Sequence, residues 1–166
     1  MKKIIFISQP LSSRIPNIKK NEFNFYNFVF NFSNSYNFRT VLCLHPEEKD
    51  NLIKIKKNYD TKKVKILMGT KNIFKEKSDF VVGMFSTELI KACFLGKIII
   101  NFFIDKEISK NFILKRLGIS HEVSSSKKMY QILKSKKIKK VNKIDLLKKF
   151  DFLKGSSKKL IETLNQ

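Results

Sequence analysis

The stretch that most constrains the fold of this chain runs from residue 79 to residue 97. It begins with a short apolar, β-branched run that suits a strand buried on both faces of a parallel sheet. Gly83 permits a sharp turn, and Ser86 or Thr87 can cap a helix whose apolar residues recur at helical spacing. Gly96 ends that helix before a second apolar run. The order strand, turn, helix, strand predicts an α/β fold.

The rest of the chain repeats this alternation of apolar runs and helical patterns. Residues 21–32 alternate Phe and Tyr with Asn, which is compatible with a strand, but the surrounding rhythm favours an amphipathic helix with its aromatic rings in the core. We therefore predict a Rossmann-like open parallel sheet of about five or six strands, flanked by helices, over residues 1–125. The expected strands are 2–7, 39–44, 63–67, 80–82, 98–103 and 119–123, and the other expected helices are 51–59, 72–77, 86–95 and 108–117.

Residues 126–166 form a Lys-rich C-terminal segment. Two or three basic helices are expected there, at 127–136, 143–153 and 157–164, packing on the sheet domain or extending from it. The lysines between 134 and 143 are typical of a solvated helix face. A functional interpretation is peripheral contact with an anionic membrane, because each Lys near such a surface contributes about 1 kcal/mol of attraction.

The charge of the chain limits the kinds of partner that it can attract. Its 166 residues carry a formal net charge of +21, with a pI near 10.0. Such a field draws in a nucleotide diphosphate, an anionic lipid surface or RNA. Nucleic acid is the less favoured partner, because nearly all the positive residues are Lys and recognition of bases and phosphates favours the forked Arg side chain. An A/T-rich genome would also enrich Lys, Asn, Ile and Phe together, so codon bias is a second source of the positive charge.

Cysteine usage and hydropathy indicate a cytoplasmic protein. Cys43 and Cys93 lie in separate apolar runs without Cys-x-x-Cys spacing, which is typical of buried thiols in a reducing compartment. The apolar start at residues 4–7 is shorter than a signal peptide requires, and no run approaches the roughly 20 residues of a membrane span. We expect no metal, cofactor or disulfide.

Two short motifs fall where predicted strands end. His45 and Pro46 follow one strand, and Ser86 and Thr87 follow another at the start of a helix. Unpaired amides and the helix dipole at such a helix end can hold a phosphate, and an imidazole can donate a hydrogen bond to it. Taken alone, Ser86 could serve only as a helix cap and His45 only as a loop cap. Because ligands of open parallel sheets bind at the carboxyl ends of the strands, the expected pocket walls are Ser8, Gln9, Pro10, Glu47 and Gly69.

The two motifs together resemble the C-terminal, nucleotide-sugar-binding half of GT-B glycosyltransferases, and most closely bacterial sialyltransferases and polymerases that use CDP-glycerol. Those families carry a His-Pro motif, here Leu44-His45-Pro46-Glu47, and a later Ser-Ser or Ser-Thr pair, here Met84-Phe85-Ser86-Thr87. The apolar-Gly-apolar run that follows the pair also matches, as 93–98. The likeness covers about residues 1–105.

The resemblance implies a function and a set of binding residues. His45 would contact the phosphate or ribose of a nucleotide-activated sugar, such as CMP-sialic acid or a CDP- or UDP-linked donor, and Ser86 and Thr87 would hold its phosphate. Lys91 stands where related domains often place a ribose-binding Glu. GT-B enzymes also have a second domain that supplies the general base and the acceptor site, so a separately encoded acceptor-binding partner is expected.

Two other functions remain open from the sequence. One is a non-catalytic basic module that binds RNA or an anionic membrane through the C-terminal helices. The other is a remnant of a UDP-sugar epimerase, which shares the architecture but also uses a second domain and paired acidic residues. Surface-glycan synthesis by the GT-B half-domain is the leading hypothesis.

Overall fold

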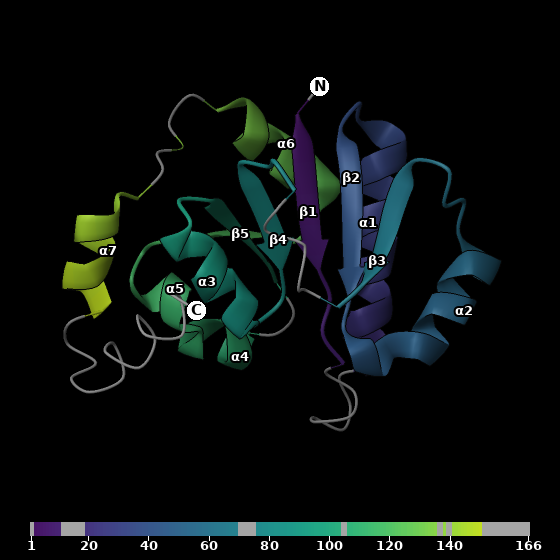
Figure 1. The fold of residues 1–166 in the computed structure, drawn as a ribbon, viewed down its shortest axis with the longest axis horizontal. Coiled ribbons are helices and arrows are strands. Elements are labelled where there is room, and N and C mark those ends of the chain that lie inside the picture. Colours follow the sequence, from purple (N-terminus) through teal and green to yellow (C-terminus); the bar gives the residue numbers. More distant parts are fainter. Residues whose placement is uncertain are drawn as a thin grey trace.

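The computed structural model describes residues 2–10, 19–69, 76–103, 106–135, 138 and 141–150. Its centre is a six-stranded parallel sheet with the order β3-β2-β1-β4-β5-β6 (Figure 1). From β1 the chain adds β2 and β3 towards one end of the sheet, and then returns to the other side of β1 to add β4, β5 and β6. The strand order therefore reverses between β1 and β4. The predicted open α/β sheet is confirmed. The strands are β1 (Lys3–Ile7), β2 (Arg39–Leu44), β3 (Val64–Met68), β4 (Phe80–Gly83), β5 (Ile98–Phe102) and β6 (His121–Val123).

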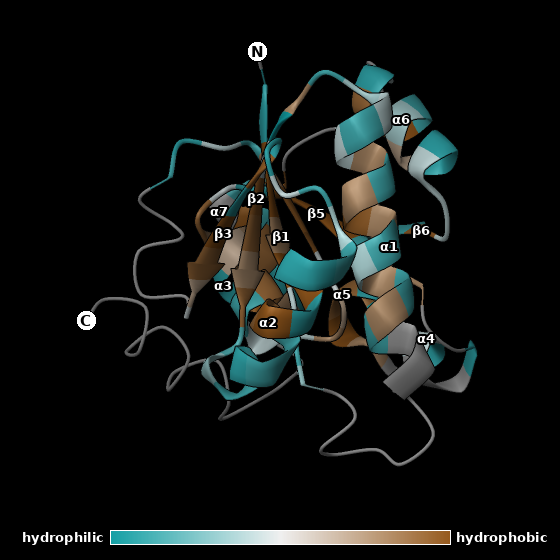
Figure 2. Cartoon of the chain, turned by 90° about the vertical axis from the view of Figure 1, so that its right-hand side faces the viewer, coloured by the Kyte–Doolittle hydropathy of each residue, from teal (hydrophilic) through white to brown (hydrophobic). Residues whose placement is uncertain are grey.

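Helices cover both faces of the sheet (Figures 1 and 2). The first face packs against α1 (Lys19–Ser35), α2 (Lys49–Asn58) and α6 (Ser126–Lys134). The second packs against α3 (Thr87–Phe94), α5 (Ile113–Arg116) and α7 (Lys143–Phe150). A one-turn 3₁₀ helix, η2 (Pro46–Glu48), precedes α2, and α4 (Lys106–Asn111) precedes α5. No helix in the described part of the chain is long and apolar enough to cross a membrane.

The aromatic run of α1 forms the centre of the first core, as the helical interpretation predicted. The ring of Phe6 on β1 lies 6.1–6.4 Å from the rings of Phe25, Phe28 and Phe32. These positions follow the helical spacing of three to four residues, so one face of α1 supplies all three rings. Figure 2 shows the strands as a hydrophobic layer and hydrophilic residues along part of α1.

The structure changes two of the expected elements. The helix predicted at 108–117 is two helices, because Phe112 is extended and caps α5 while its ring packs on Phe85 at 5.2 Å. The last strand begins at His121, two residues later than expected. The helix predicted at 72–77 falls mostly outside the described residues, and Glu76 and Lys77 are not helical.

The first two C-terminal helices of the sequence prediction correspond to α6 and α7. Met129 and Leu133 of α6 join the first core, and Leu146 and Phe150 of α7 join the second. Both helices therefore pack on the sheet. The third predicted helix, 157–164, lies outside the described residues, and a domain boundary at residue 125 stays a prediction.

Candidate functional site at the carboxyl edge of the sheet

The residues that the sequence marked as a site all lie at the carboxyl edge of the sheet. His45 follows β2, the 8–10 segment follows β1, Gly69 follows β3, and Ser86 follows β4. Because β1 separates β2 from β4, two strand spacings separate the ends of β2 and β4, which amounts to about 10 Å. The edge between β1 and β4 is also where the strand order reverses, the usual ligand position in open α/β sheets.

Gly83 allows β1 and β4 to approach closely at this edge. A Cβ atom added to Gly83 would lie 3.0 Å from the carbonyl oxygen of Ile7 and 3.1 Å from the Cδ2 of Leu89. Both distances are tighter than ordinary contacts between a side chain and its neighbours. The glycine therefore sets the spacing at the reversal point and seats the first turn of α3 against the sheet.

Ser86 begins α3 as its N-cap. Its Oγ accepts a hydrogen bond of 3.2 Å from the backbone amide of Glu88, and the residue is buried. Thr87, the first residue of the helix, is exposed. The carboxylate of Glu88 is paired with the Nζ of Lys91 at 2.9 Å. Lys91 is therefore paired within the first turns of α3.

His45 has one ring nitrogen engaged in a hydrogen bond with the backbone. The side chain is about one-third exposed, and its Nδ1 accepts a hydrogen bond of 3.3 Å from the backbone amide of Glu47. An Nδ1 that accepts leaves the proton of a neutral imidazole on Nε2. His45 can therefore donate from Nε2 to an external oxygen while it caps η2.

A buried polar network behind His45 was not predicted from the sequence. Glu48 is 2% exposed, and its Oε2 accepts from the backbone amide of His45 at 2.7 Å. Its Oε1 accepts from the hydroxyl groups of Ser8, at 2.6 Å, and Tyr26. Burial and the neighbouring Glu48 carboxylate raise the pKa of Tyr26, so the phenol stays protonated and donates. The network ties the ends of β1 and β2 to α1.

The available sequence signal for Glu48 was its capping pattern, since it stands three residues after the N-cap His45 and closes a capping box with it. The hydroxyl partners come from Ser8 and Tyr26, which are distant along the chain, and local sequence carries no sign of them.

Pro46 and Gly69 meet beside this network. Gly69 has a φ of +73°, donates its amide to the carbonyl of Leu44 at 2.8 Å, and would place a Cβ 3.9 Å from the ring of Pro46. Its own carbonyl accepts from the thiol of Cys43 at 2.7 Å. The proposed wall residue Gly69 therefore lies next to the His-Pro motif, and both belong to one rim.

Buried polar atoms without partners also lie at this edge. Asn101, at the carboxyl end of β5 and in register with Gly83, is fully buried, and neither its Nδ2 nor its Oδ1 has a hydrogen-bond partner among the residues that the structure describes. In the same described part, the Oε1 of Gln9, after β1, is likewise buried without one. Leaving such groups unpaired costs about 1–3 kcal/mol each, which is consistent with a site that a ligand or water completes. An Asn within an otherwise apolar strand was the available sequence signal for Asn101.

A second polar cluster lies farther along the same edge. Glu122 of β6 is in register with Asn101, and its Oε2 accepts from the Nζ of Lys115 at 2.9 Å and from the hydroxyl of Ser109. Burial would raise the pKa of Glu122, but these two bonds outweigh it and lower the pKa. The carboxylate is satisfied within the protein, so this cluster supports the edge and is not a free acid.

Comparison of the chain with protein-family models, curated proteins and solved structures finds no match.

Proposed function

We propose that the carboxyl edge binds the phosphate of a nucleotide-activated sugar, as the C-terminal half of a GT-B glycosyltransferase does. The observation that carries the proposal is the reversal of strand order between β1 and β4, with a serine-capped helix directly after β4. His45 stands at the end of β2, on the other side of β1, and its Nδ1 is engaged as an acceptor, so Nε2 would be the donor. A separate acceptor-binding domain would complete the enzyme.

The chemistry assigned to these residues is binding and charge stabilisation. The amides at the start of α3, with the hydroxyl groups of Ser86 and Thr87, would hold the phosphate, and His45 would donate to another of its oxygens. Each charged hydrogen bond contributes about 1.5–3 kcal/mol at best, so base and sugar contacts must supply the rest of a micromolar affinity of about 8 kcal/mol. The general base would come from the partner domain.

Titration of the purified protein with CMP, CDP and UDP tests the proposal. We expect binding detectable by calorimetry or chemical-shift changes, and a loss of about tenfold or more in His45→Ala and in Ser86→Ala, corresponding to about 1.4 kcal/mol each. His121→Ala is the matched histidine control, since His121 begins β6 at the far side of the sheet.

Ser86→Ala also removes a helix cap, so its control must do the same elsewhere. Ser125 is the N-cap of α6, where its side chain accepts from the amide of Lys128. Ser125→Ala should lose a similar amount of stability, about 1 kcal/mol, and keep its nucleotide affinity. Nucleotide binding that persists unaltered in both His45→Ala and Ser86→Ala would reject the proposal.

A further inference from the structure

A groove runs along the opposite, amino-terminal edge of the sheet. It consists of two adjoining cavities of about 770 and 650 Å³, which share Lys3, Arg39 and Glu76 as lining residues. We call it the amino-edge groove. It is formed by the starts of β1, β2 and β3, the end of α1, and the residues that lead into β4. None of the residues proposed for nucleotide binding lines it.

The amino-edge groove concentrates positive charge beyond what composition alone explains. Of the described residues that line it, eight are Lys or Arg and two are Glu or Asp. A third cavity, of about 480 Å³ between α1 and the ends of β5 and β6, is lined by Asn, Ser and Phe, with no charged residue among those that the structure describes. The lysines are therefore not spread evenly among the described cavities. Cations that lie close together repel one another, and a bound anion offsets this repulsion.

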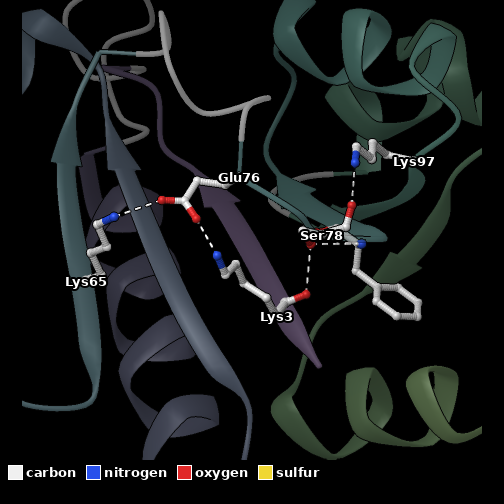
Figure 3. Close-up of polar contacts among 6 residues, drawn as sticks. Lys3, Lys65, Glu76, Ser78 and Lys97 are labelled. Atoms are coloured by element: carbon white, nitrogen blue, oxygen red, sulfur yellow. Dashed lines mark hydrogen bonds and ion pairs between the residues drawn. The ribbon is translucent and has the colours of Figure 1, made fainter. Parts of the chain in front are cut away.

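Glu76 fixes two of these cations in place. Figure 3 shows Glu76 between Lys65 of β3 and Lys3 of β1, and one carboxylate oxygen binds each Nζ, at 2.8 Å for Lys65. Hydrogen bonds from Lys3 and Lys65 lower the pKa of Glu76 to about 2, so the carboxylate stays ionised. On the other side of the groove, the Nζ of Lys97 donates to the carbonyl of Ser78 at 2.6 Å. These lysines are held at fixed positions, which lowers the entropy cost of binding an anion.

The remaining lining offers further contacts for phosphate. Lys62 and Lys63 are exposed, and the hydroxyl of Thr40, a residue only 3% exposed, has no hydrogen-bond partner in the described part of the chain. Tyr36 and Phe38 also line the groove, but their rings pack in the first core, where Tyr36 stacks on Tyr130 at 4.2 Å and Phe38 lies 5.4 Å from Phe32. Cations along a concave path are a feature of sites that follow the backbone of single-stranded nucleic acid.

We propose that the amino-edge groove binds single-stranded nucleic acid through its phosphate backbone. Two consecutive cavities suit a linear chain of phosphates better than one mononucleotide, and a concave path does not fit a flat lipid surface. Seven of the eight cations that line the described groove are Lys, which act as point charges without the fork that reads bases, so binding should depend little on sequence. The groove would act independently of the carboxyl edge.

Fluorescence anisotropy with a labelled uridine oligonucleotide tests the proposal on the full chain. The double variant Lys62→Glu/Lys63→Glu should weaken binding by about tenfold or more and reduce the slope of log affinity against log salt by about two. Both residues are exposed, and circular dichroism verifies that the variant folds. The milder Lys62→Gln/Lys63→Gln should give a smaller loss in the same direction.

A control of equal charge separates the groove from the overall field. Lys127→Glu/Lys148→Glu makes the same charge change at exposed positions of α6 and α7 that do not line the groove, and it should keep most of the affinity. Equal losses in the two double variants, or no binding by the unaltered protein, would overturn the proposal. So would phosphatidylserine vesicles that bind through Lys62 and Lys63 while the oligonucleotide does not. Nucleotide titration of the groove variant reports separately on the carboxyl edge.

Discussion

The Oε2 atom of Glu48 and the backbone amide of His45 are joined by a hydrogen bond of 2.7 Å, so a buried carboxylate holds the histidine of the proposed site in place. The other oxygen of the same carboxylate binds Ser8 and Tyr26, which belong to the end of β1 and to α1. The orientation of His45 thus depends on residues from three elements. Ionised acceptors with several donors are the strong class of hydrogen bonds.

Glu48→Gln tests the importance of this network. The amide keeps the size of the side chain but removes the charge and turns one acceptor into a donor that faces another donor. We expect the free energy of unfolding to fall by about 2–3 kcal/mol, measured by urea denaturation. Glu47→Gln, at a neighbouring carboxylate that is 58% exposed, should change it by less than about 0.5 kcal/mol. Similar values for the two variants would show that the network contributes little.

Gly83→Ala tests the close approach of β1 and β4. The added methyl group would meet the backbone carbonyl of Ile7, which cannot move aside as a side chain can, and Leu89. We expect a loss of about 1–3 kcal/mol in the free energy of unfolding and a weaker nucleotide affinity, because α3 must shift.

The control for Gly83 is Gly96, where the backbone conformation favours glycine and close packing does not. Gly96 has a φ of +69°, and none of the described residues places an atom within 4 Å of a Cβ added there. Asn tolerates that backbone conformation, so Gly96→Asn should be nearly neutral, whereas Gly83→Asn should be at least as damaging as Gly83→Ala. A tolerated Asn at both positions would mean that the spacing at residue 83 is not critical.

The strands of this fold were predictable because parallel strands buried on both faces read as continuous apolar runs. The bounds of β2 agree with the prediction, and those of the other strands differ by at most two residues. Helix α1 was harder, since Phe and Tyr alternating with Asn carry the period of a strand as well as that of a helix. The break at Phe112 arises from its packing on Phe85, a contact between distant residues that local pattern does not contain.

The candidate site was predictable only in part. Placement of His45 and Ser86 at one edge follows from parallel strands and short motifs, and the structure has them there. The role of Glu48 depends on its hydrogen bonds with Ser8 and Tyr26. The amino-edge groove likewise depends on lysines that come from separate strands. Such arrangements are products of tertiary structure, so neither could be derived from spacing along the chain.

Both cysteines are predicted to resist thiol reagents in the folded protein. Cys43 is fully buried and Cys93 is 2% exposed, in agreement with the sequence prediction of buried thiols. Burial raises the pKa of each thiol from 9.0 to about 12, and for Cys43 the carboxylates of Glu88 and Glu48 add to the effect. At neutral pH, the thiolate fraction of each cysteine should therefore be about a thousandfold lower than that of a thiol with the ordinary pKa of 9.0. Disulfide-exchange labelling should be slow in buffer and rapid in denaturant, and rapid labelling of the folded protein would contradict this.

Glu76 gives the protein an acid-sensitive contribution to stability. Hydrogen bonds from Lys3 and Lys65 lower its pKa from 4.5 to about 2. The unfolded chain therefore takes up this proton at higher pH than the folded chain does. The stabilisation is fully present above about pH 4.5 and is lost as the pH falls towards about 2. Urea unfolding across that range should show a decline that Glu76→Gln reduces, because the variant has no carboxylate to protonate.

Two variants distinguish the ion pairs of Glu76 from other acid-sensitive groups. Lys65→Gln removes one of its two cationic partners and leaves Lys3, so the pH dependence should lie between those of the unaltered protein and Glu76→Gln. In the Glu76→Gln background, the same lysine change should have a much smaller effect, since its partner is already neutral. Added salt should weaken the contribution in the unaltered protein, because these side chains are partly exposed and their charges are screened. An acid dependence that is identical in all these variants would assign it to other carboxylates.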